Sequence, residues 1–369
     1  MVCRRHVLFA ILDWGMGHAT RTWPLILAAR AAGAQVTVAS RGTAAAWLQE
    51  RMKAADADGG GQGQPSWSFV EKPGTEIRYA HGRRTLPTIA LQMPAFLSSI
   101  AKERAWTKDI IQRRGITHVI SDNCYGAHPP KGHIPSALIS HQVSPPVPTL
   151  ARGVARAQVR SWAAHFSQVW IPDSGEGEMA GYLSVPPFSH PKFIGPLSRF
   201  SAMDDAPASP EESASDGPPL VGMVSGPEPQ RSLMEAALLE CFQRDGRPAV
   251  IFSGRPEGGE RQAGAVRILH HADDHHIRRA LLSASCIICR SGYTSLMDLA
   301  TLRVHAVLVP TPGQPEQEYL ARHWAQRWGW PRLPQAELSS FQPRDLAETP
   351  VKLPTAASQA QQLMRDWLA

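Results

Sequence analysis

Two short segments in the last third of the chain carry the residue types that bind phosphate groups. Each accompanies an apolar run, at residues 284–289 and 304–309, that predicts a buried parallel strand. Cys289-Arg290-Ser291-Gly292 ends the first run, and Pro310-Thr311-Pro312-Gly313-Gln314 follows the second. Both lead into predicted helices, so two helix N-termini should meet at the carboxyl edge of one sheet, where α/β proteins bind anions. The sequence therefore predicts a phosphate site at this edge.

Carboxylates in the same segments suit sugar hydroxyls. Asp298 lies two helical turns past Ser291, and Glu316 lies in the first turn after Gly313. Carboxylate oxygens accept hydrogen bonds from hydroxyl groups, so the predicted ligand is a nucleotide diphosphate carrying a sugar. Small residues after the first strand of the second half leave room for its diphosphate. The predicted donor-binding residues are Ser225, Gly226, Arg290, Ser291, Gly292, Thr294, Asp298, Gly313, Gln314, Glu316 and Gln317.

The end of the first predicted strand carries a second group of candidates, Asp13-Trp14-Gly15-Met16-Gly17-His18. Its glycines let a substrate approach the backbone closely. The turn lacks the third glycine of a dinucleotide fingerprint and the Lys-Ser/Thr pair of a P-loop, which excludes both of those sites. His18 is the first candidate for a general base, because imidazole is basic near neutral pH. Asp122 is the second candidate and Asp13 the third, and a surface side chain in a tight turn is the alternative for His18.

Polar side chains also follow two later strands of the first half. Ser121-Asp122-Asn123 and Ser140-His141-Gln142 each stand where a predicted strand ends. Such positions share one edge of a parallel sheet, so they predict a pocket for an acceptor hydroxyl. A helix cap is the alternative for Asp122. The predicted acceptor-side residues are Gly15, Gly17, Asn123 and His141.

Two patterns that look like metal sites are explained without a metal. Cys286 and Cys289 are three residues apart on a predicted strand, so their thiols point to opposite faces. The histidines and aspartates of residues 270–276 span a strand end and a helix start, where Asp is a favoured N-cap. We therefore predict no metal, and no cofactor besides the nucleotide-sugar substrate.

Composition bounds the class of protein. A chain of 369 residues should form about two domains. Its formal charge of +6 fits an anionic partner without distinguishing phosphate, a membrane surface or nucleic acid; given the motifs above, no nucleic acid is predicted. The apolar run before Asp13 is too short for a signal core or a membrane span, and the cysteines are odd in number. We expect a cytoplasmic protein that is at most peripheral at the inner face of the membrane.

A lipid-linked acceptor would favour such peripheral contact. Basic and aromatic residues of the first half suit an anionic amphiphile at a membrane surface. A solvated helix face with unrelated buried tryptophans is the alternative. The residues concerned are Trp14, Trp23, Arg83, Arg84, Lys102 and Arg104.

Strands and helices alternate in two runs, which predicts two α/β domains with parallel sheets. Between Ser198 and Pro219 the sequence is rich in Ser, Asp, Glu, Pro and Ala, as in a linker. Residues 86–114 predict one long helix or a pair broken near Pro94, and the last helix, 356–368, can pack on either domain. The predicted boundaries are 1–197 for an acceptor-binding domain, 198–219 for a linker, 220–350 for a donor domain and 351–369 for a C-terminal helix.

With these residues placed, the chain resembles the GT-B glycosyltransferases. Its second half is similar to the family of the UDP-N-acetylglucosamine transferase that forms lipid II. In that family a C-R-S-G segment is followed by a Glu that binds the ribose, then by a proline-ended strand and a Gln-bearing segment that contacts the donor sugar. The matching positions here are Cys289–Gly292, Asp298 in place of the Glu, Pro310 and Glu316-Gln317. The family's first loop, with its glycines and histidine, resembles Gly15–His18.

Over nearly its whole length the chain also resembles uncharacterised bacterial glycosyltransferase-like proteins. The shared signatures, in order, are DWGxGHATR, SDNxYG, GPLSRF, SGPEPQR, RSGYxxxMDL and PTPGQxEQEYLA. The resemblance implies a GT-B fold, with two Rossmann-like α/β domains facing across a crevice. It implies a hexosyl- or N-acetylhexosaminyltransferase that uses a nucleotide sugar, most simply a UDP-sugar, with inversion and without metal. The acceptor is a small molecule or is lipid-linked. The alternatives are a nucleotide-sugar epimerase or hydrolase on the same fold, and a non-catalytic nucleotide-sugar-binding partner.

Overall fold

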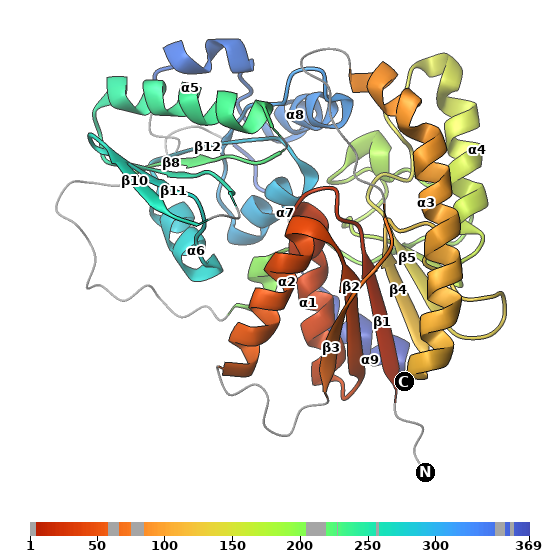
Figure 1. Cartoon of the computed structure of the whole chain (residues 1–369). Coiled ribbons are helices and arrows are strands. Elements are labelled where there is room, and N and C mark those ends of the chain that lie inside the picture. Colours follow the sequence, from red (N-terminus) through yellow and green to blue (C-terminus); the bar gives the residue numbers. More distant parts are fainter. Residues whose placement is uncertain are drawn as a thin grey trace. The chain divides into compact units, whose positions relative to one another are not determined.

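The chain folds into two compact α/β units (Figure 1). The computed structural model describes residues 5–57, 66–74, 85–203, 219–226, 228–255, 258–343, 351–354 and 358–369; within them, the side chains of 85–93 and 202 are not described. One unit consists mainly of residues 1–199 with the C-terminal helix, and the other mainly of Phe200–Thr355. Arg83, Arg84 and most of the predicted linker, 204–218, lie outside the described residues.

The first unit is built on a seven-stranded parallel sheet with the order β3-β2-β1-β4-β5-β6-β7. The chain runs outward from β1 to β3, then returns to the other side of β1 for β4 and continues to β7. Its strands are β1 (His6–Ile11), β2 (Gln35–Ser40), β3 (Trp67–Glu71), β4 (His118–Asp122), β5 (Ser136–Ile139), β6 (Gln168–Ile171) and β7 (Lys192–Phe193). Its helices are α1 (Gly17–Ala31), α2 (Gly42–Ala55), α3 (Thr85–Arg114), α4 (Arg152–Ala163) and α9 (Ala360–Leu368), with 3-10 helices at Thr149–Ala151, Gly181–Ser184 and Arg199–Ala202.

Helices cover both faces of this sheet, which explains why its strands are apolar throughout. Alternate residues of β1, such as Phe9, pack in one cluster with α1, α2 and α9. Leu8 and Val119 face the other way and pack with Ile110 of α3. The first sheet is therefore a buried central layer between helices.

The last helix, α9, belongs to the first unit although it follows the whole second unit in sequence. Its buried residues Leu363 and Met364 join the cluster formed by α1 and β1. The ring of Trp367 lies 5.1 Å from that of Trp170 on β6. Of the two partners that the sequence left open for this helix, the structure selects the first domain.

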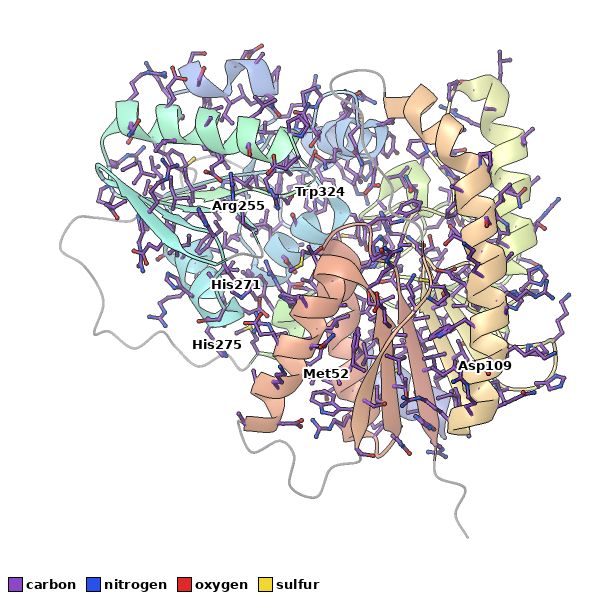
Figure 2. The ribbon with its side chains drawn as sticks, in the orientation of Figure 1. Met52, Asp109, Arg255, His271, His275 and Trp324 are labelled. Carbon is purple, nitrogen blue, oxygen red and sulfur yellow. The ribbon has the colours of Figure 1, made fainter. Side chains whose placement is uncertain are left out.

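The second unit is built on a six-stranded sheet with the order β10-β11-β9-β8-β12-β13. All neighbouring strands are parallel except β10 and β11. Its strands are β8 (Leu220–Met223), β9 (Ala249–Phe252), β10 (Glu260–Ala263), β11 (Val266–Leu269), β12 (Cys286–Cys289) and β13 (Val307–Leu308). Its helices are α5 (Gln230–Asp245), α6 (Asp274–Ser283), α7 (Tyr293–Leu302) and α8 (Pro315–Trp328), with a 3-10 helix at Gln335–Ser340. Trp324 of α8, labelled in Figure 2, is fully buried beside Trp330.

The structure differs from the sequence-based expectations, or decides between them, at several of these elements. The strand expected at 304–309 is hydrogen-bonded as a strand only at Val307–Leu308. The antiparallel edge strand β10 was not foreseen, because its residues Glu260–Ala263 are mostly polar and exposed. Residues 85–114 form one continuous helix despite Pro94, so the broken pair is wrong. Trp23 is buried against Trp47 and Trp67, so it does not contribute to a membrane-facing surface.

Candidate active site

The first sheet changes its winding direction between β1 and β4. Open α/β sheets bind ligands at such a point, outside the carboxyl ends of the strands. The register pairs Ile11, the last residue of β1, with Asp122, the last residue of β4. His18 reaches the same place from the first turn of α1. The topology thus brings together two residues that are about a hundred positions apart in sequence.

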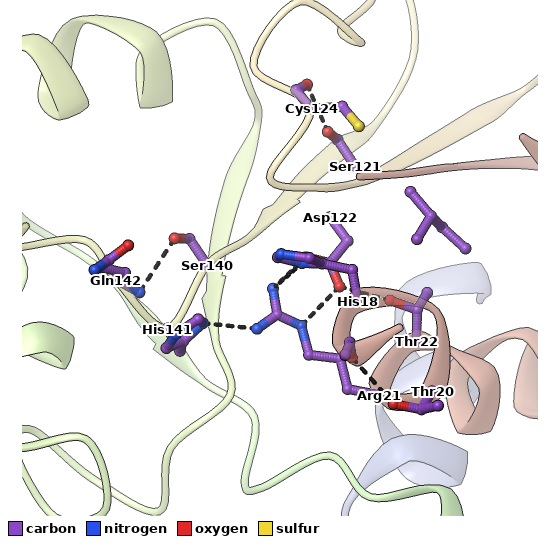
Figure 3. A network of polar contacts seen from close by, with 12 residues as sticks. His18, Thr20, Arg21, Thr22, Ser121, Asp122, Cys124, Ser140, His141 and Gln142 are labelled. Carbon is purple, nitrogen blue, oxygen red and sulfur yellow. Dashed lines mark hydrogen bonds and ion pairs between the residues drawn. The ribbon is translucent and has the colours of Figure 1, made fainter. Parts of the chain in front are cut away.

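Asp122 is the centre of a buried polar network (Figure 3). Its Oδ2 accepts hydrogen bonds from Arg21 Nε and from Thr22 Oγ1, each at 2.7 Å. Its Oδ1 is paired with Arg21 Nη2 and lies 2.9 Å from His18 Nδ1. Burial opposes ionisation of Asp122, but the charges and hydrogen bonds of Arg21 and His18 outweigh it and hold the pKa of this carboxyl well below its usual range. Asp122 is therefore an ionised, fully paired carboxylate.

The network fixes how His18 presents its ring. An ionised carboxylate only accepts hydrogen bonds, so Nδ1 of His18 must carry the proton that it donates to Asp122. Arg21 Nη2 carries two hydrogens, lies 3.0 Å from the same nitrogen and also donates to Asp122 Oδ1. In the neutral ring, a proton on Nδ1 leaves Nε2 without one, on a side chain that is 15 % exposed while that of Asp122 is 0 % exposed. A ring held in this way can remove a proton from a hydroxyl group.

The other two candidate bases have different surroundings. Asp122 is a weak base because it is ion-paired, so its geometry fits orienting His18 rather than removing a proton. Asp13 lies in a separate cluster, with its carboxylate 3.4 Å from Arg41 Nε and 3.6 Å from Lys72 Nζ. Among the three candidates, only His18 has the geometry of a base.

The predicted acceptor-side residues take several positions around this network. Gly15 is exposed, has a φ of +92°, and a side chain there would meet nothing. Gly17 begins α1. His141 is buried and its Nδ1 accepts a hydrogen bond of 2.6 Å from Arg21, so it supports the arginine. Asn123 adopts a φ of +54°, a left-handed conformation that Asn tolerates better than most residues.

Arg21 and Thr22 complete the site, and the sequence analysis did not assign them a role. The sequence nevertheless indicates that Arg21 lies beside His18, because residues three apart on a helix share a face. His18 and Arg21 have that spacing at the start of α1, after a strand that ends in glycines.

The second sheet also changes direction once, between β8 and β12. Met223 and Cys289, at the ends of these strands, are paired in register. Ser225 and Gly226 follow β8 and are exposed. Gly226 has a φ of +97° and open space on its side-chain face, so a ligand can approach its backbone. The predicted donor edge therefore coincides with the switch point of this sheet.

Arg290 is placed differently from the expectation that it meets a diphosphate. Its side chain is fully buried, and it donates to the backbone carbonyls of Val309 at 3.2 Å and Gln230 at 2.8 Å. Burial lowers its pKa to about 10, so it stays charged at neutral pH. Arg290 thus connects the ends of β12 and β13 to the start of α5. Because its side chain is buried, it does not contact a ligand in this conformation.

Ser291 and the turn before α8 bring the two predicted helix N-termini together. The Ser291 hydroxyl donates to the carbonyl of Gln317 in the first turn of α8, at 2.8 Å. Gln317 accepts from the Thr311 amide through its side chain, at 2.9 Å, while Gln314 caps the helix by accepting from the Gln317 amide at 2.6 Å. At α7 the N-cap is Gly292, which has no side chain to cap the helix. The Ser291–Gln317 hydrogen bond thus joins the starts of α7 and α8.

The predicted donor residues thus divide by accessibility. Asp298 is only 2 % exposed on α7, which argues against a direct ribose contact in this conformation. The buried members are Arg290, Ser291, Asp298 and Gln317. The exposed or partly exposed members are Ser225, Gly226, Gly292, Thr294, Gly313, Gln314 and Glu316.

The sites that resembled metal centres have other structural roles. Asp273 caps α6 by accepting from the His276 amide at 2.7 Å. Cys286 and Cys289 are buried free thiols, and Cys286 packs with Ile288 on one face of β12. The described ranges contain no group of three or more His, Cys, Asp or Glu side chains placed to hold a metal ion.

Within the same ranges, no helix has both the length and the apolar character of a membrane-spanning segment.

Residues 266–366 match the glycosyltransferase family 28 C-terminal domain. Among solved structures, the chain is similar to the glycosyltransferase SnogD from Streptomyces nogalater, with 14 % identity, a TM-score of 0.57 and coverage of 99 % of this chain and 95 % of that one. It is similar to MurG from Acinetobacter baumannii, with 17 % identity, a TM-score of 0.54 and 99 % coverage of both chains. It is also similar to Arabidopsis thaliana UGT89C1 complexed with quercetin, with 14 % identity, a TM-score of 0.59 and coverage of 99 % and 94 %. No curated protein matches the sequence.

These similarities define the fold of the protein. The two α/β sheets have the GT-B fold of the solved glycosyltransferases. The chain therefore has a GT-B fold like that of MurG, and its residues 266–366 match the C-terminal domain of glycosyltransferase family 28.

Proposed function

We propose that the chain transfers a hexosyl or N-acetylhexosaminyl group from a nucleotide-diphosphate sugar, most simply a UDP-sugar, to an acceptor hydroxyl. The observation that carries this proposal is the His18–Asp122 pair at the switch point of the first sheet. An imidazole oriented by a buried carboxylate is suited to activating a hydroxyl nucleophile. The acceptor is a small molecule or a lipid-linked one, and the reaction belongs in the cytoplasm or at the inner face of the membrane.

In the proposed reaction, Nε2 of His18 takes the proton of the acceptor hydroxyl. The acceptor oxygen bonds to the anomeric carbon as the bond from that carbon to the diphosphate oxygen breaks, and the nucleoside diphosphate leaves with the electron pair. A single displacement of this kind inverts the anomeric configuration. Asp122 keeps Nδ1 protonated and stabilises the imidazolium as it forms.

Charge on the leaving diphosphate needs stabilisation in the second unit. The N-terminus of α7 after Gly292, with the exposed backbone at Ser225-Gly226, offers amide donors and a helix dipole for this purpose. Arg290 contributes by holding these segments in place. Because the site has its own electropositive groups, we propose that the reaction needs no divalent metal.

The test is incubation of the purified protein with UDP-, GDP- and dTDP-sugars, with and without EDTA. A transferase should release nucleoside diphosphate slowly in water, faster with a suitable alcohol, and equally in EDTA. Rapid isomerisation of the sugar would identify an epimerase, and binding without turnover would identify a non-catalytic partner. Complete loss of turnover in EDTA, restored by magnesium or manganese, would contradict metal independence.

A further inference from the structure

The first unit contains a second buried polar cluster beside the His18 network. Lys72, directly after β3, is 3 % exposed, and its Nζ lies 3.0 Å from Glu103 Oε1 on α3 and 3.6 Å from Asp13 Oδ1 after β1. Arg41 lies on the other side of Asp13. The two cations and two carboxylates balance. The charged groups of this cluster are therefore paired with one another.

A small hollow is lined in part by this cluster. Its volume is about 10 Å³, close to the least that admits a single water-sized group. Its lining includes the charged residues Asp13, Lys72 and Glu103, the aromatic residues Trp14 and Phe96, and Asn123. A hydroxyl group fits such a space, whereas a sugar or an aromatic ring does not.

Asn123 lines the hollow and carries an unsatisfied polar atom. Its Oδ1 is buried and has no hydrogen-bond partner. A buried carbonyl oxygen without a partner costs about 1–3 kcal/mol of free energy. An amide oxygen only accepts hydrogen bonds, so its complement is a donor such as a hydroxyl. Asn123 follows Asp122 directly, so the hollow adjoins the His18 network.

Aromatic rings extend from the hollow in a row. Trp14 lies 5.4 Å from Phe96 on α3, and Phe96 lies 5.8 Å from Trp162 on α4. Trp162 lies 4.6 Å from Tyr125 in the loop after β4. All four side chains are partly exposed, and Trp14 and Tyr125 also pack against core clusters. Exposed ring faces of this kind bind other rings, either aromatic ones or the C–H face of a sugar.

We propose that the hollow and the aromatic row form an acceptor subsite for a ring that bears several hydroxyl groups. One hydroxyl would donate to Asn123 Oδ1 while the face of the ring lies on Phe96, which leaves a neighbouring hydroxyl to approach His18. The inference rests on the proposed function and names its acceptor class. A pyranoside and a polyphenol share this chemistry, whereas an acyclic alcohol has no ring face to place on the aromatic row.

Calorimetric titration with three probes tests the proposal: methyl β-D-glucopyranoside, quercetin and 1,6-hexanediol. We expect one of the two ring probes to bind the wild-type protein and the diol not to bind. Asn123→Gly removes the amide oxygen but permits the left-handed backbone, and should weaken that ring probe about fivefold, the equivalent of one hydrogen bond of about 1 kcal/mol. Phe96→Leu should weaken it about tenfold, and Leu97→Ala, an exposed neighbour on α3, should leave it unchanged.

The ring probe that binds shows whether the subsite takes a pyranoside or a polyphenol. Absence of binding by both ring probes up to about 10 mM, or equal binding of the diol, would overturn the subsite. So would wild-type affinity in both Asn123→Gly and Phe96→Leu, with circular dichroism confirming their fold. If Asn123→Gly does not fold, Phe96→Leu and Leu97→Ala decide the matter. Slow nucleotide-sugar hydrolysis by the wild type would leave the proposed function standing even if the subsite fails.

Discussion

At the scale of single residues, Asp122 determines what the first site can do. It receives hydrogen bonds from Arg21, Thr22 and His18 and lies wholly inside the protein. A carboxylate in this position is both an orienting group for His18 and the counter-charge of the buried Arg21. Function and stability therefore depend on the same side chain.

Asp122→Asn should destabilise the protein by about 3–5 kcal/mol at pH 7, because it leaves Arg21 buried without its counter-charge. The folded-state pKa of Asp122 is depressed, so its stabilising effect is present above the unfolded-state pKa, near about 3.9. It is lost as pH falls below that value toward the folded-state pKa. The difference in free energy of unfolding between wild type and variant should be constant from about pH 5 to 8 and shrink below about pH 4.

Urea denaturation at several pH values measures this difference. Asp109→Asn is the matched control, because Asp109 forms an exposed ion pair with Arg113 on α3 (Figure 2) and such pairs contribute at most about 1 kcal/mol. If Asp122→Asn were no more destabilising than Asp109→Asn, the buried ion pair would not have the role assigned to it.

The sequence revealed some of these residues better than others. His18, Asp122 and Asn123 were found because they stand where strands end, which is a local feature. Lys72 and Glu103 were not found, since their pairing depends on how α3 crosses the sheet. Arg290 was found, but its burial was not, because a sequence pattern places an arginine at the edge of a sheet without showing whether its side chain is buried.

At the scale of elements, the loop after β4 depends on a close approach to α3. A Cβ atom on Gly126 would lie 2.1 Å from the carbonyl oxygen of Ile100 and 2.8 Å from Cβ of Glu103. The Gly126 amide also donates to Glu103 Oε2 at 3.3 Å. This glycine therefore sets the position of the segment that carries Asp122 and Asn123.

Gly126→Ala should lower stability by about 1–3 kcal/mol, the usual cost of overpacking, and should lower the melting temperature accordingly. Gly153→Ala is the control, because Gly153 lies on α4 and an added Cβ there meets no atom within 4 Å. Alanine favours helices, so this control should be neutral or slightly stabilising. Equal melting temperatures for the two variants would show that the loop is not held against α3 as described.

The C-terminal helix provides a second prediction about elements. Met364→Ala should destabilise the first unit by about 2–5 kcal/mol, because Met364 is fully buried against it. Gln361→Ala, on the exposed face of the same helix, should have little effect. Hydrogen exchange of amides in α1 and β1 measures the local effect, and unchanged protection of these amides in Met364→Ala would contradict the assigned packing.

Most strands could be predicted because their apolar character is uniform and local. The apolar run at 284–289, for example, contains the strand β12, Cys286–Cys289. The partner of α9 could not be predicted, because its apolar face gives no indication of which domain it covers. The edge strand β10 pairs through backbone groups of polar residues, and such pairing leaves little trace in a hydrophobicity pattern.

At the scale of the whole molecule, two sheets of the same kind carry different chemistry at their switch points. In the first sheet, side chains form the site, and an imidazole is oriented by a buried ion pair. In the second, we propose that backbone amides and a helix N-terminus form it, while Arg290 and Ser291 are buried and hydrogen-bonded to backbone carbonyls. We therefore expect that the base and the proposed donor contacts can be altered separately.

The proposal that His18 is the general base is tested by the turnover of His18→Ala at saturating nucleotide sugar. We predict a loss of about 10²- to 10⁴-fold, the usual range for a general base, with the Kd for the free nucleoside diphosphate unchanged because donor contacts lie in the second unit. His133→Ala, an exposed histidine of the same unit, should keep wild-type turnover. Near-normal turnover in His18→Ala would contradict the account.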